Sequence, residues 1–565
     1  MQRPWEKHYS ENALAFDPAS MDARTLPQLI DQAAQRFGDK PAMTTVLPNG
    51  IQGSVSYADL HREAEHFAAY LREVLGLQTG DAVAVMTPNC NSFGVAALGI
   101  FKAGCIATFV NPLYTVPELE HQLTDSAAKV LVIIDLFGDK VDAVIDKTPV
   151  EHVVTLSLLE FFPAPQRAFV NFIMKRVKKV VPAMRTPAVS MKQALAEGRR
   201  AAAGADIGSY TVDVSPTDTA LYQYTSGTTG RSKGAMLHHQ GIISNAQQGR
   251  LMAECAMGPD GETALVALPL YHITAFVLLF VSGLLHGGHG VLIPSPRPPA
   301  NMKAALTKHR ITWVTGINTL YAALLAEPWF DRKLFENVRF FGSGGAAQHV
   351  GVARKWEEQT GFDIKEGYGM SECCGVLTVN PPDNNRLGTV GVPVPGMEVR
   401  IVDDAGVAQP PNTPGEVVLR GPTMMKGYLN RPDATAETIK DGWLYSGDIG
   451  VMDEDGFVQI VDRKKDMILV SGFNVSPNEI EDAISAMPEV VQVGVIGVPD
   501  DRSGEVPMAF VVRGDETLTE DAVVETCRGS LTNYKIPKKV LFVSEVPMTL
   551  SGKVLRRQLR EEYLS

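Results

Sequence analysis

Hydrophobic residues along the first part of the chain follow two patterns in turn, one typical of strands and one typical of helices. Residues 81–90, 129–135 and 152–157 are largely apolar runs. Such runs are typical of strands buried on both faces of a parallel sheet. Residues 92–104 follow the first run, and their last residue, Gly104, is a common helix end. This alternation predicts an α/β fold with parallel-type sheets covered by helices.

The pattern changes after about residue 386. Short β-like runs at 398–406, 415–422 and 456–466 alternate with turn residues, which predicts a small β subdomain. A helix and a strand return at 477–500, and the chain closes with a charged helix. A chain of 565 residues exceeds the usual limit of one domain, about 250–300 residues. We expect a large N-terminal domain, with two parallel-type sheets and the β subdomain, and a small α+β C-terminal domain.

Three features bear on the cellular compartment. The most apolar run, residues 273–285, is shorter than the roughly 20 residues that cross a bilayer, so it predicts a buried helix. Residues 1–16 are polar and lack the apolar centre of a signal peptide. The six cysteines include no C-x-x-C pair, which is typical of reduced thiols. We therefore expect a cytoplasmic protein.

The net charge of the chain argues against one class of binding partner. The net charge is −12, so the chain lacks the basic excess that nucleic-acid binding requires, and we expect no nucleic-acid partner. An anionic ligand would have to be held by local donors against this negative background.

The segment 161–185 has a basic amphipathic character. Apolar side chains fall near one face at helical spacing, and basic side chains lie among them: Phe169, Phe172, Ile173, Val177 and Val180, with Lys175, Arg176, Lys178 and Lys179. Two interpretations stay open. The segment either lies on an anionic membrane surface or packs its apolar face on its own domain.

The stretch 224–237, "YTSGTTGRSKGAML", holds the clearest chemical signal. Glycines allow tight turns and close backbone approach to a ligand, and backbone N–H groups in such a loop form an anion-binding concavity. Hydroxyl side chains and Lys233 add donors and charge. Ser232 precedes the lysine and Gly234 follows it, so this is not a Walker A loop. The stretch predicts a phosphate-binding loop that leaves a strand, and a flexible surface turn is the alternative interpretation of these residues.

Five further motifs stand in a fixed order after this loop. They are "GSGGAA" at 342–347, "EGYGMSE" at 366–372, "YSGDIG" at 445–450, "DRKKDMILVSGFNVSPNEIE" at 462–481 and "SGKVLRR" at 551–557. Together with the glycine-rich loop they closely resemble the signature of the AMP-forming adenylating enzymes, and they cover nearly the whole chain. The family usually has threonine where this chain has Ser371, which keeps the hydroxyl.

The resemblance implies a two-step reaction with ATP, Mg²⁺ and CoA. A carboxylate is activated to acyl-AMP with release of pyrophosphate, and a thiol then displaces AMP. Lys553 and Glu372 match the catalytic positions, Glu372 also as the Mg²⁺ ligand. The positions that match the ATP/AMP site are Thr225, Ser226, Gly227, Thr228, Thr229, Gly230, Lys233, Gly344, Gly345, Ala346, Glu366, Gly367, Tyr368, Gly369, Ser371, Asp448 and Arg463.

The resemblance also implies that the C-terminal domain swings between the two steps. It places the N-terminal domain at 1–462, a hinge at 463–465 that includes Lys465, and the mobile C-terminal domain at 466–565. Ser471, Gly472 and Phe473 would line the CoA tunnel.

The stretch 268–279 indicates which kind of carboxylic acid is the substrate. It has His272 but no acidic residue to pair with an amino acid's ammonium group, whose burial without a partner would be costly. An acid with an uncharged tail is therefore the expected substrate. CoA is the expected acceptor, because the chain ends eight residues after Arg557 and we expect no carrier domain. The chain looks most similar to bacterial long-chain fatty acid–CoA ligases, and His272, Thr274, Asn318 and Gly344 are the expected acyl-pocket residues, with His272 also a catalytic candidate.

Two alternatives remain beside a fatty acid–CoA ligase. One is a CoA ligase for medium-chain, dicarboxylic or aryl acids. The other is a lipid-binding module that has lost catalysis, which would predict damage at Lys553, Glu372 or Asp448, yet all three residues are present. The acyl chain length and the choice between monomer and homodimer stay open.

Overall fold

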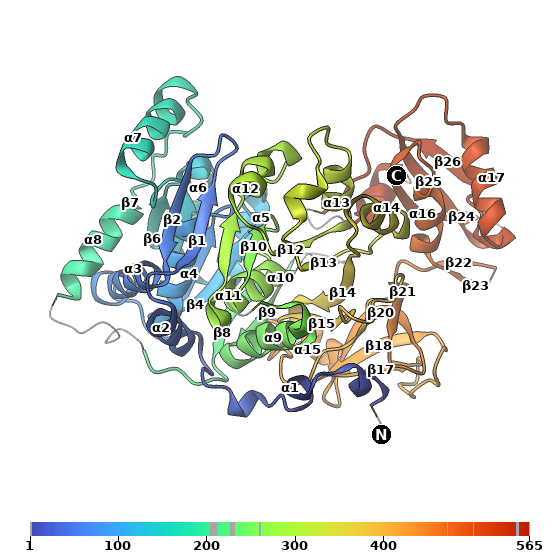
Figure 1. The fold of residues 1–565 in the computed structure, drawn as a ribbon, viewed down its shortest axis with the longest axis horizontal. Helices are drawn as coiled ribbons and strands as arrows, with labels where there is room; N and C mark the ends of the chain where they lie inside the picture. Colours follow the sequence, from blue (N-terminus) through green and yellow to red (C-terminus); the bar gives the residue numbers. More distant parts are fainter. Residues whose placement is uncertain are drawn as a thin grey trace.

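Four sheets organise the described part of the chain (Figure 1). The computed structural model describes residues 3–203, 212–225, 232–258, 261–471, 473–500, 502–549 and 553–563. Two large sheets and one small sheet form the body, and the fourth sheet lies with the C-terminal helices at the right of Figure 1. The helices up to residue 438 are α1 (Glu11–Leu14), α2 (Leu26–Phe37), α3 (Tyr57–Ala69), α4 (Asn91–Lys102), α5 (Val116–Asp125), α6 (Gly138–Val144), α7 (Ala164–Phe172), α8 (Met191–Ala201), α9 (His239–Met252), α10 (Ile273–Ala275), α11 (Ser282–His286), α12 (Lys303–Lys308), α13 (Asn318–Leu325), α14 (Val350–Thr360) and α15 (Pro432–Thr438).

The two large sheets are mainly parallel. The seven-stranded sheet has the order β7 (Val189–Ser190), β6 (His152–Leu156), β5 (Ala128–Ile134), β3 (Ala82–Met86), β4 (Ile106–Val110), β8 (Thr219–Thr225) and β9 (Lys233–His238). The nine-stranded sheet has the order β16 (Val392–Pro393), β15 (Gly375–Val379), β14 (Lys365–Met370), β13 (Phe340–Ser343), β12 (Trp313–Gly316), β10 (Thr263–Val266), β11 (His289–Leu292), β1 (Pro41–Val46) and β2 (Gln52–Ser56). The predicted α/β architecture is confirmed.

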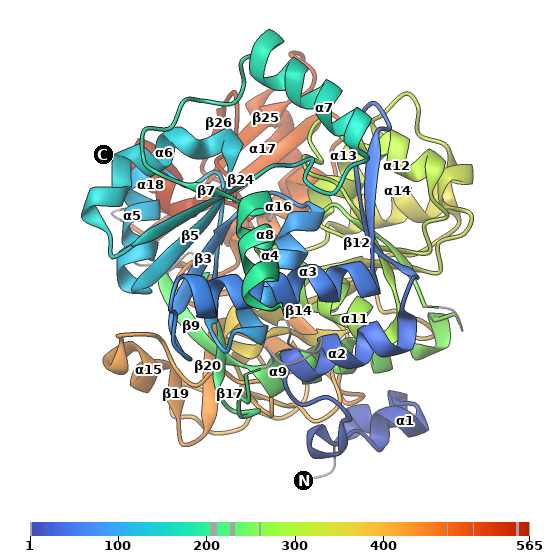
Figure 2. The same cartoon turned by 90° about the vertical axis from the view of Figure 1, so that its left-hand side faces the viewer.

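Helix α4 joins the two large sheets into one core. It contacts β3 and β4 on one side and β1 and β2 on the other, and every residue of the helix is buried. Helix α3 packs beside α4, and α8 packs on α3, as Figure 2 shows. Because α4 is covered on all sides, its sequence is apolar around the whole helix rather than along one stripe.

The β subdomain and the C-terminal domain follow in the predicted order. The subdomain sheet contains β17 (Glu398–Val402), β18 (Gly415–Arg420), β19 (Ile439–Lys440), β20 (Trp443–Met452) and β21 (Val458–Arg463). The C-terminal domain contains β22 (Ile468–Val470), β23 (Phe473–Val475), α16 (Pro477–Ser485), β24 (Val490–Asp500), β25 (Gly504–Arg513), α17 (Glu520–Ser530), β26 (Lys539–Phe542) and α18 (Arg556–Tyr563). One sheet therefore ends at Arg463 and the next begins at Ile468.

The apolar run at 273–285 forms a largely buried helix, as predicted. It consists of α10, a π-helical turn η8 (Phe276–Val281) and α11 in direct succession. Helix α10 contacts β15 and α11 contacts α2, so the helix runs from the strand that follows Glu372 toward the outer part of the domain. Among the described residues, no helix is both long and apolar enough to cross a membrane.

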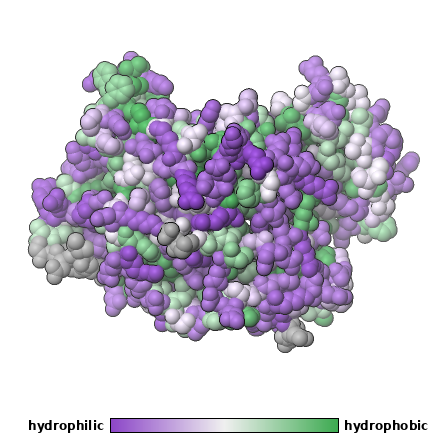
Figure 3. All heavy atoms as spheres, in the orientation of Figure 1, coloured by the Kyte–Doolittle hydropathy of each residue, from purple (hydrophilic) through white to green (hydrophobic). Residues whose placement is uncertain are grey.

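The segment 161–185 forms α7 and the π-helical turn η6 (Ile173–Val177), which project from one corner of the body (Figure 1). Val170 and Met174 pack on a small core of Leu47, Leu159 and Phe162. Most of the predicted apolar face does not pack in this way, because the following side chains are exposed: Phe169, Phe172, Val177 and Val180. Green atoms gather on this corner in Figure 3. The interpretation that this face packs on its own domain is therefore wrong for these four residues.

Candidate active site

The stem of the predicted phosphate loop is a hairpin of β8 and β9. Thr225 and Lys233 face each other at its open end. Residues Ser226, Gly227, Thr228, Thr229 and Gly230 lie outside the described residues. Helix α5 supports the stem, since Asp125 accepts a hydrogen bond from Tyr224 Oη (2.8 Å) and His121 Nε2 donates to the carbonyl oxygen of Ser232 (2.9 Å).

The "GSGGAA" loop at 342–347, which the resemblance to the adenylating enzymes places at the adenine (the adenine loop), follows β13 and lies against β14. The parallel pairing of these strands brings Ser343 opposite Glu366, so the loop with Gly344, Gly345 and Ala346 and the motif with Gly367 and Gly369 meet at one sheet edge. A Cβ at Gly344 would lie 3.1 Å from the carbonyl oxygen of Gly367, and Gly345 has φ of +87°. Glycine at these positions permits the close backbone approach.

Glu366 is buried beneath this loop. Its Oε1 accepts a hydrogen bond from the backbone N–H of Gln348 (2.9 Å). Burial raises the pKa of the carboxyl to about 8, and the negative charge of Asp482 in the C-terminal domain acts in the same direction, while the Gln348 hydrogen bond opposes the shift. Glu366 is therefore mainly protonated at neutral pH, and it supports the loop as an uncharged group.

Three predicted nucleotide contacts come together across the β subdomain. Asp448 on β20 stands opposite Arg463 on β21, and Arg463 Nε lies 2.7 Å from Asp448 Oδ1. Tyr368 on β14 donates from its Oη to Asp448 Oδ2 (2.5 Å). Burial raises the pKa of the Tyr368 phenol well above its ordinary value, with a further contribution from the charge of Asp448, so the phenol remains a donor. The buried carboxylate is thereby oriented by two donors.

Glu372 follows β14 in a short 3-10 turn with Ser371 and is buried. Its Oε1 accepts a hydrogen bond from Tyr428 Oη (2.7 Å). The ring of Tyr428 also lies 5.1 Å from Lys233 Nζ, so this tyrosine touches both a predicted phosphate contact and the predicted metal ligand. Tyr428 could not be predicted from the sequence, because a lone tyrosine in "KGYLN" carries no distinctive spacing.

Lys553 reaches this group of residues from the C-terminal domain. Its backbone N–H donates to Thr549 Oγ1 (3.0 Å), and its carbonyl oxygen accepts from the N–H of Thr549 (2.8 Å). The pKa of its ammonium is lowered, first by the loss of surrounding water and then by the positive charge of Arg463, while Asp448 and Glu372 oppose the shift. The residue keeps solvent access.

His272 caps the N-terminus of α10. Its Nδ1 accepts a hydrogen bond from the backbone N–H of Thr274 (3.4 Å), so the proton of the neutral ring sits on Nε2. Loss of surrounding water lowers the pKa of His272 to about 4, and the positive charge of Lys553 acts in the same direction. The imidazole is therefore neutral at physiological pH.

Asn318 has different partners from those expected of an acyl-pocket residue. Its Oδ1 accepts hydrogen bonds from Gln348 Nε2 (2.9 Å) and from the backbone N–H of His349 (3.1 Å). Asn318 thus supports the segment that follows the adenine loop. A direct role of Asn318 and Thr274 in an acyl pocket stays a prediction.

The hinge and CoA-tunnel residues lie between and beyond the two small sheets. Lys465 lies in the connection between β21 and β22, and its pKa is lowered, chiefly by loss of surrounding water. Ser471 has φ of +51°, and its N–H donates to the carbonyl oxygen of Ser503 (2.7 Å). Phe473 is 57% exposed and stacks on Tyr534. Gly472 lies outside the described residues.

Known proteins match this chain over nearly all of its length. Residues 30–429 match the AMP-binding enzyme family, and residues 479–553 match the AMP-binding enzyme C-terminal domain. The long-chain-fatty-acid–CoA ligase of Escherichia coli O6:H1 is 43% identical, over 95% of this chain and 94% of its own.

Two solved structures share the fold. The ATP-bound MatB from Rhodopseudomonas palustris has a TM-score of 0.80 at 32% identity, covering 95% of this chain and 99% of its own. The anthranilate CoA ligase AuaEII, in complex with anthranoyl-AMP, has a TM-score of 0.83 at 25% identity, covering 97% and 99%. The chain therefore belongs to the AMP-binding enzyme family, and within it to the AMP-forming acyl-CoA synthetases of the adenylate-forming superfamily.

Proposed function

We propose that this enzyme activates a long-chain fatty acid with ATP and transfers the acyl group to CoA. The observation that carries the proposal is the position of Lys553, whose ammonium is within electrostatic reach of Glu372, Asp448 and Arg463 although it comes from the other domain. The E. coli relative, a long-chain-fatty-acid–CoA ligase, supports the choice of acid. The stretch around His272 has no acidic residue, and its neighbours Leu270, Ile273 and Phe276 are buried in the apolar core, which suits an apolar acyl tail better than a cationic one.

In the first step a carboxylate oxygen of the fatty acid attacks the α-phosphorus of ATP. The bond from that phosphorus to the bridging oxygen breaks, and the electron pair leaves with pyrophosphate. No proton is transferred, so the protein contributes orientation and charge. Lys553 donates to the oxygens on which negative charge develops, and Asp448, oriented by Tyr368 and Arg463, holds the ribose.

Glu372 is the residue that would hold Mg²⁺ on the ATP phosphates. It is a buried carboxylate with one oxygen oriented by Tyr428. One carboxylate combined with phosphate oxygens and waters suits this cation, so the donor set fits. When bound, Mg²⁺ would supply neutralisation of the phosphate charge.

In the second step the CoA thiol loses its proton to solvent and its sulfur attacks the acyl carbonyl carbon. The bond from that carbon to the phosphate oxygen breaks, and AMP leaves with the electron pair. We propose that the domain 466–565 turns about 463–465, with Lys465 at the pivot, and brings Ser471, Gly472 and Phe473 toward the site. The exposure of Phe473, which is 57% exposed although its ring stacks on Tyr534 of the same domain, supports this proposal. A hinge in a short connection between two sheets is physically reasonable.

Acid-dependent pyrophosphate exchange, measured over saturated acids of increasing length and over dicarboxylic and aryl acids, tests the assignment. We expect the highest kcat/KM with long-chain acids and product formation only when CoA is present. If kcat/KM were highest with aryl or medium-chain acids, those acids would be the substrates instead. Absence of exchange with every acid would contradict an adenylating activity.

We further propose that the protein works in the cytoplasm and that α7 and η6 contact the surface of an anionic membrane. All six cysteines are free, and Cys255 is exposed, which suits a reducing compartment. Phe169 is 62% exposed and Phe172 is 60% exposed, and the basic side chains of the same segment are exposed beside them. Apolar side chains within a basic segment are the combination that binds an anionic bilayer.

Replacing Lys175, Arg176, Lys178 and Lys179 by glutamine will weaken binding to vesicles that contain anionic lipid. Each basic residue near an anionic surface contributes about 1 kcal/mol, so the partition constant should fall at least about 100-fold. Co-sedimentation with vesicles measures this constant. Arg199 and Arg200 on α8 are also exposed, and their replacement by glutamine serves as the control. Equal binding of the wild type and the fourfold variant would exclude membrane contact through this segment.

A further inference from the structure

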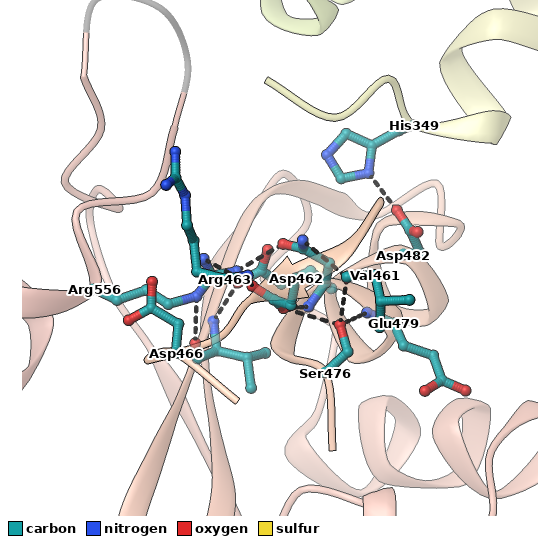
Figure 4. Close-up of polar contacts among 12 residues, drawn as sticks. His349, Val461, Asp462, Arg463, Asp466, Ser476, Glu479, Asp482 and Arg556 are labelled. Atoms are coloured by element: carbon teal, nitrogen blue, oxygen red, sulfur yellow. Dashed lines mark hydrogen bonds and ion pairs between the residues drawn. The ribbon is translucent and has the colours of Figure 1, made fainter. Parts of the chain in front are cut away.

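A polar contact joins the two domains beside the adenine loop. His349, directly before α14 in the N-terminal domain, lies with Nδ1 2.9 Å from Oδ1 of Asp482 on α16 (Figure 4). Ser485, one turn further along α16, places its Oγ 3.2 Å from the same ring nitrogen. His349 is partly buried, with 27% of its side chain exposed. Helix α16 thus holds one imidazole of the other domain at two points.

The same helix holds the segment that carries Lys553. Arg556, three residues after the lysine, donates from Nη2 to Oε1 of Glu481 and to Oδ1 of Asn478, both at 2.8 Å, and from Nε to the carbonyl oxygen of Val495 (3.0 Å). Glu481 is the neighbour of Asp482. A displacement of α16 against His349 would therefore also displace the backbone that carries Lys553.

In the N-terminal domain, hydrogen bonds connect His349 and its neighbour to residues of the proposed nucleotide site. The backbone N–H of His349 donates to Asn318, and the backbone N–H of its neighbour Gln348 donates to the buried Glu366. Both residues directly follow the adenine loop at 342–347. The position of His349 is consequently set by the same backbone that would receive the base.

We propose that His349 and Asp482 are positioning residues that dock α16 on the adenine loop and so place Lys553 for the first half-reaction only. The inference rests on the proposed function, because it assumes that Lys553 acts in adenylation. It follows that the His349–Asp482 contact must break when the C-terminal domain turns for the second half-reaction. This pair would then set how readily the enzyme passes from one step to the next.

The Asp482→Asn variant tests the proposal. We expect adenylation, measured as pyrophosphate exchange, to fall about fivefold in kcat, equal to about 1 kcal/mol and the upper range for a partly exposed ion pair. Thioester formation from supplied acyl-AMP should stay equal to the wild type or rise. Equal losses in both half-reactions, or unchanged adenylation, would overturn the proposal.

Two further variants separate positioning from general damage. Glu479→Gln changes the same charge on the same helix, but Glu479 pairs with Lys535 inside the C-terminal domain (2.6 Å), so neither half-reaction should change. In the double variant His349→Asp with Asp482→His the two residues are exchanged, so a carboxylate again faces an imidazole. Adenylation by the double variant should therefore be faster than by either single variant. Failure of the exchange to recover activity, with both proteins folded, would count against a direct contact.

The pH dependence of adenylation distinguishes the proposed ion pair from a merely structural role of these residues, which would not change with the charge of His349. The Asp482 carboxylate raises the pKa of His349, and Glu481 on α16 adds to the shift. The ion pair is therefore fully formed below the ordinary histidine pKa of about 6.5 and is lost as pH rises through the raised value. Glu481 (pKa about 7) and Glu366 (pKa about 8) ionise over the same range, and Glu366 then repels Asp482. The advantage of the wild type over Asp482→Asn should shrink between pH 6 and pH 9.

A distance measurement keeps this proposal separate from the proposed function. Spin labels on exposed positions of the two domains, such as Arg332→Cys and Arg528→Cys with the exposed Cys255 replaced by serine, report domain orientation in the full-length protein without turnover. We expect Asp482→Asn to lower the population of the orientation seen in this structure, whichever acid is the substrate. An unchanged distance distribution would overturn the docking role even if the enzyme proves active on fatty acids.

Discussion

The Lys553→Ala variant will lose adenylation and keep thioester formation. We expect pyrophosphate exchange to fall about 100- to 1,000-fold, the usual cost of removing one preorganised group that stabilises transition-state charge. Lys553 is the cation that the C-terminal domain supplies to Glu372 and Asp448, and only the first step develops negative charge at the α-phosphate. With acyl-AMP supplied, the release of AMP by CoA should proceed at close to the wild-type rate.

Lys539→Ala is the matched control for this prediction. Lys539 is an exposed lysine of the same domain, at the start of β26, and its loss should leave both half-reactions unchanged. The measurements are pyrophosphate exchange for the first step and thioester formation from acyl-AMP for the second. If Lys553→Ala impaired both steps equally, the account in which the domain presents different faces in the two steps would be refuted.

The Asp448→Asn variant will bind ATP poorly. Asp448 is buried and accepts from Tyr368 and Arg463, so its carboxylate is held in one orientation, and we propose that it accepts from the ribose hydroxyls there. Hydrogen bonds to a charged group contribute about 1.5–3 kcal/mol each, so we expect KM for ATP to rise between about tenfold and 100-fold. The KM for the fatty acid should change much less, since we propose that Asp448 contacts the ribose and not the acid.

Asp404→Asn provides the comparison for Asp448→Asn. Asp404 lies in the same subdomain and pairs with Lys464, but its side chain is 92% exposed. Its replacement should not change the KM for ATP, and thermal unfolding of both variants checks that the subdomain remains folded. An ATP KM in Asp448→Asn equal to that of the wild type would argue against ribose binding by this residue.

The order of the elements follows from local patterns. The apolar runs at 82–86, 128–134 and 152–156 form adjacent strands because each is apolar enough to be covered on both sides. The change of texture after residue 386 marks the β subdomain for the same local reason, since short alternating strands with turns need no helices between them. These features need only neighbouring residues in the sequence.

The contacts within the site depend on groups far apart in the chain. Tyr428 beside Glu372, and His349 beside Asp482, have no spacing signal, because their distances arise from sheet register and domain orientation. The amphipathic segment 161–185 shows the same limit. Its periodicity was compatible with both packing and exposure, and only the placement of α7 at a corner of the body leaves Phe169 and Phe172 uncovered.

The sequence by itself determined the α/β architecture and the family, because periodicity and short motifs are properties of neighbouring residues. It also pointed to Lys553, Glu372 and Asp448 as residues of one site. The tertiary structure decided which of these residues lie close together in one conformation. It also decided which neighbouring side chains orient them. A lysine and two carboxylates from separate strands and domains come within electrostatic reach only after the sheets are paired and the C-terminal domain is docked, and those long-range choices are made by packing free energy rather than by local pattern.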